Sequence, residues 1–204
     1  MRIAAIARLS ILLSRPIVRG YGRAMRQTIL MSAALSSLFV PVPAVALSHH
    51  SWSQASSIAR DGLVAVAFGL PAINGDWRGV EQSGLSVGAA FAVTESLKYT
   101  IHERRPDGSD NKSFPSGHTS ASFAAAASLE KRYGWQVGLP AHLVAAFVGV
   151  SRVEAKKHFV GDVLVGAVIG EGAGWLLTSK RDARVRWLPW GDAHGGGVSA
   201  GMRF

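Results

Sequence analysis

Three short stretches of this 204-residue chain contain the residue types needed to bind and transfer a phosphoryl group. Histidine can attack phosphorus or donate a proton, while lysine and arginine neutralise phosphate oxygens. A Pro-Ser-Gly turn that opens a helix adds free N–H groups and the positive end of the helix dipole, which both favour a bound anion. The three stretches are Lys98–Pro106, Pro115–His118 and Ser151–Asp162.

The histidines of these stretches suit two different steps. His158 and Asp162 are four residues apart, so on a helix they share a face and the carboxylate can reach the ring. The carboxylate then fixes the tautomer and leaves the second nitrogen free as a nucleophile. His118 lies at the expected anion site, where it could donate a proton to a leaving oxygen. The cations that can neutralise the phosphoryl oxygens are Lys98, Arg105 and Arg152.

These residues and their spacing resemble the signature of the type 2 phosphatidic acid phosphatase and vanadium haloperoxidase superfamily. That signature is Lys, six residues, Arg-Pro; then Pro-Ser-Gly-His; then Ser-Arg, five residues, His, three residues, Asp. Eleven specified residues match in order, which is far more specific than a lone short motif. The resemblance covers roughly Leu85–Leu177. Only eight residues separate Pro106 from Pro115, a shorter spacing than usual, so a substrate-covering loop is expected to be absent there.

The resemblance implies a role for each matching residue. His158 would attack phosphorus and form a phosphohistidine, with Asp162 holding its ring. His118 would protonate the leaving alcohol and then activate the water that releases phosphate. No metal or other cofactor is expected, because side chains supply the positive charge. The groups expected to cradle the phosphate are Lys98, Arg105, Arg152, the Ser116 hydroxyl and the Gly117 N–H.

The positive charge of the chain is concentrated near its start. Residues 1–46 hold six arginines and no acidic residue, so the overall charge of +9 gives no case for nucleic-acid binding. An apolar run, Thr28–Leu47, follows and contains Ala44-Val45-Ala46, which predicts a secretory signal peptide over 1–46. A start at Met25 would give a leader of ordinary length. The competing interpretation keeps Thr28–Leu47 as an uncleaved first membrane span.

The rest of the chain predicts an all-α fold, a compact bundle of about five to six helices over residues 47–182. The apolar stretches are mostly ten to fourteen residues long before a charge interrupts, which is shorter than the roughly 20 residues needed to cross a bilayer. This favours buried helices over membrane spans. Residues 183–204 alternate around Gly195–Gly197, which predicts a small C-terminal β-hairpin. The apolar stretches cover residues 62–74, 85–94, 119–129, 138–150 and 163–177.

The function that fits these features is a metal-independent phosphatase of the cell envelope, a phosphoric monoester hydrolase. Its expected partners are a phosphorylated substrate, a lipid phosphate or diphosphate, and the membrane surface. Its expected location is the periplasm or the membrane-associated envelope, or else the inner membrane with the site facing the periplasm. Two alternatives are a vanadate-dependent haloperoxidase, although known members are far longer, and a non-catalytic envelope lipid-binding protein.

Overall fold

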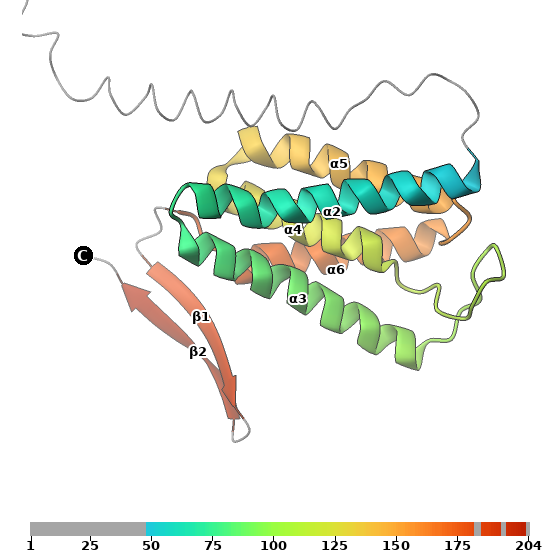
Figure 1. Cartoon of the computed structure of the whole chain (residues 1–204). Coiled ribbons are helices and arrows are strands. Elements are labelled where there is room, and N and C mark those ends of the chain that lie inside the picture. The colour runs from blue at the N-terminus through green and yellow to red at the C-terminus, as the bar shows by residue number, and fades with distance from the viewer. Residues whose placement is uncertain (1–47, 182–184, 193–194, 203–204) are drawn as a thin grey trace, which may run out of the picture. The chain divides into compact units, whose positions relative to one another are not determined.

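The main body of the protein is an all-α bundle, as predicted, and a two-stranded hairpin follows it. The structure is a computed structural model that describes residues 48–181, 185–192 and 195–202. The predicted leader, residues 1–46, lies outside the described residues. Figure 1 shows the helices, which are α2 (His49–Ile73), α3 (Trp77–Thr100), α4 (Gly117–Tyr133), α5 (Trp135–Glu154) and α6 (Val160–Leu177).

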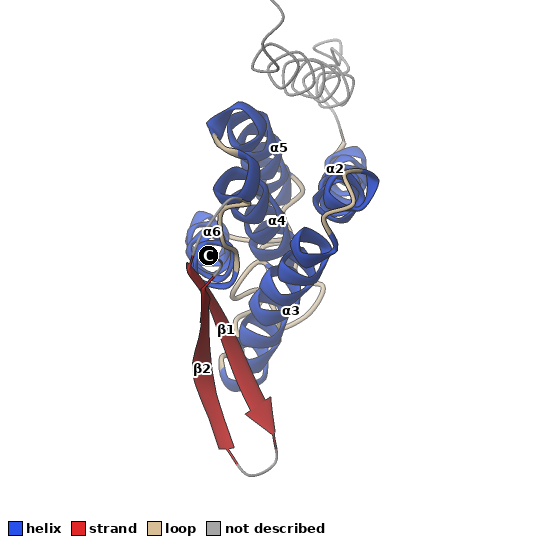
Figure 2. Cartoon of the chain, turned by 90° about the vertical axis from the view of Figure 1, so that its left-hand side faces the viewer, coloured by secondary structure: helices blue, strands red, loops and turns tan. Residues whose placement is uncertain are grey.

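Helix α4 lies at the centre, with the other four helices around it (Figure 2). It can take this position because its buried face is made of small residues; the side chains of Ala124 to Ala127 are fully buried. Consecutive helices run in opposite directions (Figure 1). The turn between α4 and α5 needs a single residue, Gly134, whose φ of 89° is open to glycine at no steric cost. As a result, the ends of α3 and α5 lie beside the starts of α4 and α6.

Helix α6 packs against α4 through glycines. Gly166, Gly170 and Gly174 recur every fourth residue, and a Cβ atom at any of them would overlap atoms of α4 or of Ser116 just before it. The large side chains of α6 therefore face outward, with Val168 72% and Leu176 83% exposed. The prediction that residues 163–177 form a buried helix is wrong for this reason, because the buried face is the glycine face.

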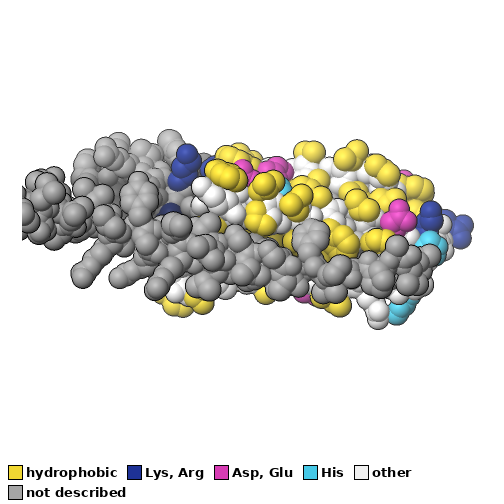
Figure 3. Space-filling model, turned by 90° about the horizontal axis from the view of Figure 1, so that it is seen from above, with side chains coloured by type: hydrophobic (Ala, Val, Ile, Leu, Met, Phe, Trp, Pro, Cys, Tyr) yellow, Lys and Arg dark blue, Asp and Glu magenta, His cyan; other side chains and the backbone are white. Residues whose placement is uncertain are grey.

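The helices are also longer than the apolar stretches that predicted them. Each predicted stretch lies within one observed helix, apart from Asn74, but every helix begins before its stretch, and α3, α4 and α5 also continue beyond it. Helices α2, α5 and α6 are 25, 20 and 18 residues long and are apolar enough to cross a membrane. The prediction that the helices are too short to span a bilayer is therefore wrong for these three. Figure 3 shows hydrophobic side chains covering much of the described part of one face.

The C-terminal hairpin is present. Strand β1 (Val185–Asp192) pairs antiparallel with β2 (Gly195–Met202), from Val185 opposite Met202 to Asp192 opposite Gly195. The three glycines were expected at the turn but lie inside β2.

A closed polar cluster lies at the end of the bundle where α4 finishes. Arg132 donates from Nε (2.5 Å) and from Nη2 to the Asp76 carboxylate, and from Nη1 to Gln82 Oε1 (3.1 Å) and to the Ser179 carbonyl (3.0 Å). Tyr133 donates to the same carboxylate at 2.9 Å. These five residues are called the Arg132 cluster below. It joins the turn before α3 to the end of α4 and to the segment after α6.

Candidate active site

All eight residues singled out in the sequence lie at one end of the bundle, opposite the Arg132 cluster. The alternating helix directions bring them there from separate parts of the chain. Lys98 is in the last turn of α3 and Arg152 in the last turn of α5, while Gly117 and His118 open α4. The others follow in the connections and the next helix start: Arg105, Ser116, His158 and Asp162.

His158 and Asp162 face each other inside the protein. They are 2% and 1% exposed, and Nδ1 of the ring lies 3.4 Å from Oδ2 of the carboxylate. That separation lies outside hydrogen-bond geometry, but it is close enough for electrostatic attraction. The expectation that both residues share a helix is wrong, because α6 begins at Val160 and His158 lies in the connection before it.

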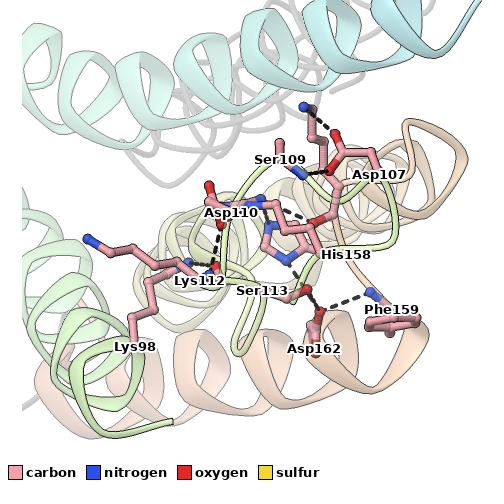
Figure 4. Close-up of polar contacts among 11 residues, drawn as sticks. Lys98, Asp107, Ser109, Asp110, Lys112, Ser113, His158, Phe159 and Asp162 are labelled. Carbon is pink, nitrogen blue, oxygen red and sulfur yellow. Dashed lines mark hydrogen bonds and ion pairs between the residues drawn. The ribbon is translucent and has the colours of Figure 1, made fainter. Parts of the chain in front are cut away.

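Asp162 is fixed by two hydrogen-bond donors. Its Oδ2 accepts the Ser113 hydroxyl at 2.5 Å and the Phe159 N–H at 2.9 Å. Figure 4 shows Ser113 and Phe159 on either side of the carboxylate, with the His158 ring facing the group. Asp162 lies in the first turn of α6, where the helix dipole also favours a negative charge. The carboxylate is therefore held in place for the ring.

Arg105 determines which nitrogen of His158 carries the proton. Its Nη1 lies 3.2 Å from His158 Nε2, and a guanidinium can only donate, so Nε2 accepts. The neutral ring then has its hydrogen on Nδ1, toward Asp162. Burial, followed by the charges of Arg105 and Arg152, lowers the pKa of His158 well below its ordinary value. The result is a neutral imidazole with the lone pair of Nε2 directed at a cation.

His118 is surrounded by donors from α2. Its Nε2 lies 3.1 Å from the Ser57 hydroxyl and 3.1 Å from Nη1 of Arg60. Burial, followed by the positive charges of Arg152 and Arg60, lowers the pKa of His118 to about 3. In the protein alone this imidazole is neutral near pH 7.

The cations at this end are poorly compensated. Arg152 donates from Nη1 only to the hydroxyls of Ser53 (3.2 Å) and Ser56 (3.3 Å), and its buried Nε has no partner among the described residues. Lys98 is also buried and donates to the Lys112 carbonyl at 3.1 Å. Neither has a carboxylate within ion-pair distance in the described part of the chain. A buried cation without a counter-charge is costly, so this arrangement is suited to an anion supplied from outside.

The start of α4 differs in one detail from what was expected. The Gly117 N–H opens the helix as predicted. The Ser116 hydroxyl is fully buried and lies 2.9 Å from the Thr119 hydroxyl. In this structure the Ser116 hydroxyl is thus paired with a residue in the first turn of α4 rather than left open for a ligand.

Short ion pairs hold the segment between Pro106 and Pro115 against the site. Arg105 Nε donates to Asp110 at 2.7 Å, and Lys157 Nζ donates to Asp107 at 2.5 Å. Arg105 also donates to the Lys157 carbonyl at 3.1 Å. These contacts fix the guanidinium that faces His158.

Sequence reasoning missed the contribution of α2. Ser53, Ser56, Ser57 and Arg60 follow at intervals of three, one and three residues, so they share one face of the helix. A polar stripe of this spacing in an otherwise apolar helix is the signal that could have revealed them. Ser113 was missed as well, and no comparable signal marks it, since its contact with Asp162 joins the connection before α4 to the first turn of α6, far apart in the sequence.

Comparison with known proteins identifies the family. The model of the PAP2 superfamily matches residues 82–186. The chain belongs to the PAP2 superfamily, as its signature predicts. The match begins inside α3, so α2 lies outside it.

Among its relatives, the chain is 40% identical over 77 residues to a lipid A 1-phosphatase of Porphyromonas gingivalis, over 36% of this chain and 17% of that protein. It is 31% identical over 124 residues to a lipid A 4'-phosphatase of Helicobacter pylori, over 55% of this chain and 62% of that protein. The chain thus spans less than two thirds of both relatives.

Two solved structures resemble the fold. The crystal structure of Aquifex aeolicus LpxE has a TM-score of 0.52 and 25% identity, over 63% of this chain and 83% of that chain. A transmembrane PAP2 type phosphatidylglycerolphosphate phosphatase from Bacillus subtilis also has a TM-score of 0.52, with 22% identity, over 84% of this chain and 89% of that chain. The second likeness concerns the fold alone.

Proposed function

We propose that this protein is a metal-independent phosphatase that hydrolyses a lipid phosphate through a phosphohistidine formed on His158. The observation that carries the proposal is the buried, neutral His158 ring, with Nδ1 toward Asp162 and Nε2 at 3.2 Å from Arg105. A phosphoryl group that displaced Arg105 slightly from the ring would meet the nucleophile and a cation together.

The reaction divides into two displacements. In the first, Nε2 of His158 forms a bond to phosphorus while the bond between phosphorus and the leaving oxygen breaks, and the proton brought by the substrate monoanion passes through His118 to that oxygen. In the second, His118 takes a proton from water, the water oxygen attacks phosphorus, and the phosphorus–nitrogen bond breaks. Inorganic phosphate leaves with the proton that His118 took from water, and both rings return to their neutral starting state.

The cations bind the oxygens that do not change partners. Arg105, Arg152 and Lys98 supply three positive charges to a group that carries about two negative charges, and the Gly117 N–H adds a donor at a helix start. In-line phosphoryl transfer needs mainly this positioning and charge stabilisation.

A lipid is the favoured substrate for two reasons. The relatives are named for phosphates of lipid A, and the chain has three helices able to cross a membrane. The outward side chains of α6 are large and apolar, while its glycines face inward, which is the pattern of a helix packed in lipid. We propose that the helical unit lies in the membrane of the cell envelope, with the site facing the periplasm.

The test is phosphate release from a panel of substrates presented in detergent beside soluble esters. The panel contains lipid A, phosphatidylglycerol phosphate, phosphatidic acid and a polyprenyl diphosphate. We expect at least one lipid to be hydrolysed faster than the soluble esters, with full activity in excess EDTA and inhibition by vanadate. Loss of activity on chelation, restored by Mg²⁺ or Zn²⁺, would contradict the mechanism.

A further inference from the structure

A fourth cation reaches the site from α2. Arg60 is the last residue of the polar stripe on that helix, and it lies outside the part of the chain that matches the family model. Its side chain is about one third exposed, at 30%. The signature residues already place three cations around a single phosphoryl group, so Arg60 is a surplus charge for that group.

The guanidinium of Arg60 is oriented by the next residue. Asp61 accepts from Nε at 2.9 Å and pairs with Nη2 at 2.7 Å, which occupies one edge of the fork. The remaining nitrogen, Nη1, lies 3.1 Å from Nε2 and 3.4 Å from Nδ1 of His118. Asp61 is itself exposed, so it directs the free edge of Arg60 inward without neutralising the interior of the site.

The cations are divided between the two histidines. Arg105 contacts His158, whereas Arg60 contacts His118. If His158 attacks phosphorus and His118 faces the leaving oxygen, Arg105 lies with the transferred group and Arg60 with the leaving group. A neutral alcohol needs no cation there, while a leaving group that carries its own phosphate does.

The contacts of His118 also support a role for Arg60 on the leaving-group side. Arg60 and the Ser57 hydroxyl both lie 3.1 Å from Nε2, the nitrogen that could face the leaving oxygen. A bound substrate must displace at least one of them. Ser57 has a second possible partner, because its one hydroxyl hydrogen can go to the Ser53 carbonyl at 3.2 Å instead of to His118. Arg60 keeps Asp61, so neither residue loses all its contacts when a substrate displaces it from His118.

We propose that Arg60 binds a second phosphate on the leaving side, so that the site accepts a lipid diphosphate and releases its terminal phosphate. The inference rests on the proposed function. In this reaction His158 bonds to the terminal phosphorus, and the bond from that phosphorus to the bridging oxygen breaks. The electron pair stays on the bridging oxygen, which becomes a terminal oxygen of the lipid monophosphate. Arg60 neutralises the charge that develops there.

The first test measures binding with no turnover. The affinities of inorganic pyrophosphate and inorganic phosphate are compared in the wild type, Arg60→Gln and Arg60→Lys by calorimetry in detergent. We expect Arg60→Gln to weaken pyrophosphate binding about tenfold more than phosphate binding, and Arg60→Lys to recover part of that difference. Equal losses for the two anions would overturn the proposal. The control is Arg104→Gln, an exposed arginine of the 101–116 segment with no contact to either histidine among the described residues.

The second test uses substrates that differ by one phosphate, farnesyl diphosphate and farnesyl phosphate. We expect Arg60→Gln to lower kcat/KM for the diphosphate about tenfold more than for the monophosphate, with an unchanged thermal midpoint. Equal losses on both substrates would overturn the role of Arg60 while leaving the phosphatase intact. If the wild type releases phosphate from neither, and from no member of the lipid panel, the proposed function itself fails and this inference with it.

Discussion

Two arginines of this protein are buried to nearly the same degree, yet their surroundings are opposite. Arg132 is 7% exposed and Arg152 is 5% exposed. Arg132 has a carboxylate, a side-chain amide and a backbone carbonyl, so each of its three nitrogens has a partner. Arg152 has two hydroxyls on one nitrogen and no partner for Nε among the described residues.

The difference separates a charge that is neutralised within the fold from one that we propose is neutralised by a bound ligand. A buried cation stabilises a fold only when its counter-charge and hydrogen bonds are supplied within the fold. The Arg132 cluster meets that condition and joins three segments of the chain. The opposite end of the bundle does not meet it, because Lys98, Arg105 and Arg152 together outnumber the carboxylates paired with them. Such an imbalance is expected where a ligand brings the missing negative charge.

The largest effect on stability is expected from breaking the closed cluster. Arg132→Gln leaves the Asp76 carboxylate buried without its cation, which should lower the free energy of unfolding by about 3–5 kcal/mol. The molecules that remain folded should keep near-normal kcat, because Arg132 lies at the far end of the bundle. Denaturation in detergent measures the first effect and phosphate release the second. A stable variant with lost activity would contradict the comparison.

The matched substitution at the candidate active site, Arg152→Gln, should lower activity and leave stability unchanged or higher. Arg152→Gln removes one cation from around the transferred group and should lower kcat/KM about 10²–10³-fold, as the loss of a preorganised donor does elsewhere. Stability should stay constant or rise, since repulsion from Arg105 is relieved. The same two assays apply. A fall in stability as large as that of Arg132→Gln would mean that Arg152 is structural.

Vanadate should stabilise the protein by binding at the candidate active site, where Arg152 lies. At a concentration of 100 times its Kd, a ligand that binds only the folded state adds about 2.7 kcal/mol to stability. We expect a shift of this size in the wild type and in Arg132→Gln, and a much smaller one in Arg152→Gln at the same concentration. Thermal denaturation with and without vanadate measures it. Equal shifts in all three proteins would place vanadate elsewhere.

The pH profile should show smaller, graded changes. Because the pKa of His118 is lowered to about 3, its ring is neutral in the free enzyme above that pH, and the proton for an alkyl leaving group must enter with the substrate monoanion. The second pKa of a phosphate ester is about 6, so kcat/KM should be steady below it and fall about tenfold per unit well above it. A loss of kcat/KM as pH falls through about 6.5 would contradict the lowered pKa of His158, because it would mean that the nucleophilic ring is protonated at the pKa of an ordinary histidine.

The sequence predicted the family, the helical class and the set of residues that meet at the site. It could do so because the signature fixes residue types and spacings that only a shared geometry explains. Which face of each helix is buried was harder to predict, because mean apolarity does not tell whether the glycines or the valines of residues 163–177 face inward. Arg60 and Ser113 were missed because their partners, His118 and Asp162, lie about 50 to 60 residues away and meet them only through packing.

The most direct test of the account is the yield of phosphoenzyme from p-nitrophenyl phosphate in two variants, trapped by rapid quench. The nitrophenolate of this ester leaves without needing a proton, so the His118→Ala variant should still become phosphorylated on His158. The intermediate should then accumulate, because water is no longer activated for its hydrolysis. The same variant should lose about 10²–10⁴-fold of its activity on an alkyl phosphate. His158→Ala should form no phosphoenzyme with either ester. A labelled intermediate in His158→Ala, or equal yields in the two variants, would contradict the assignment of His158 as the nucleophile.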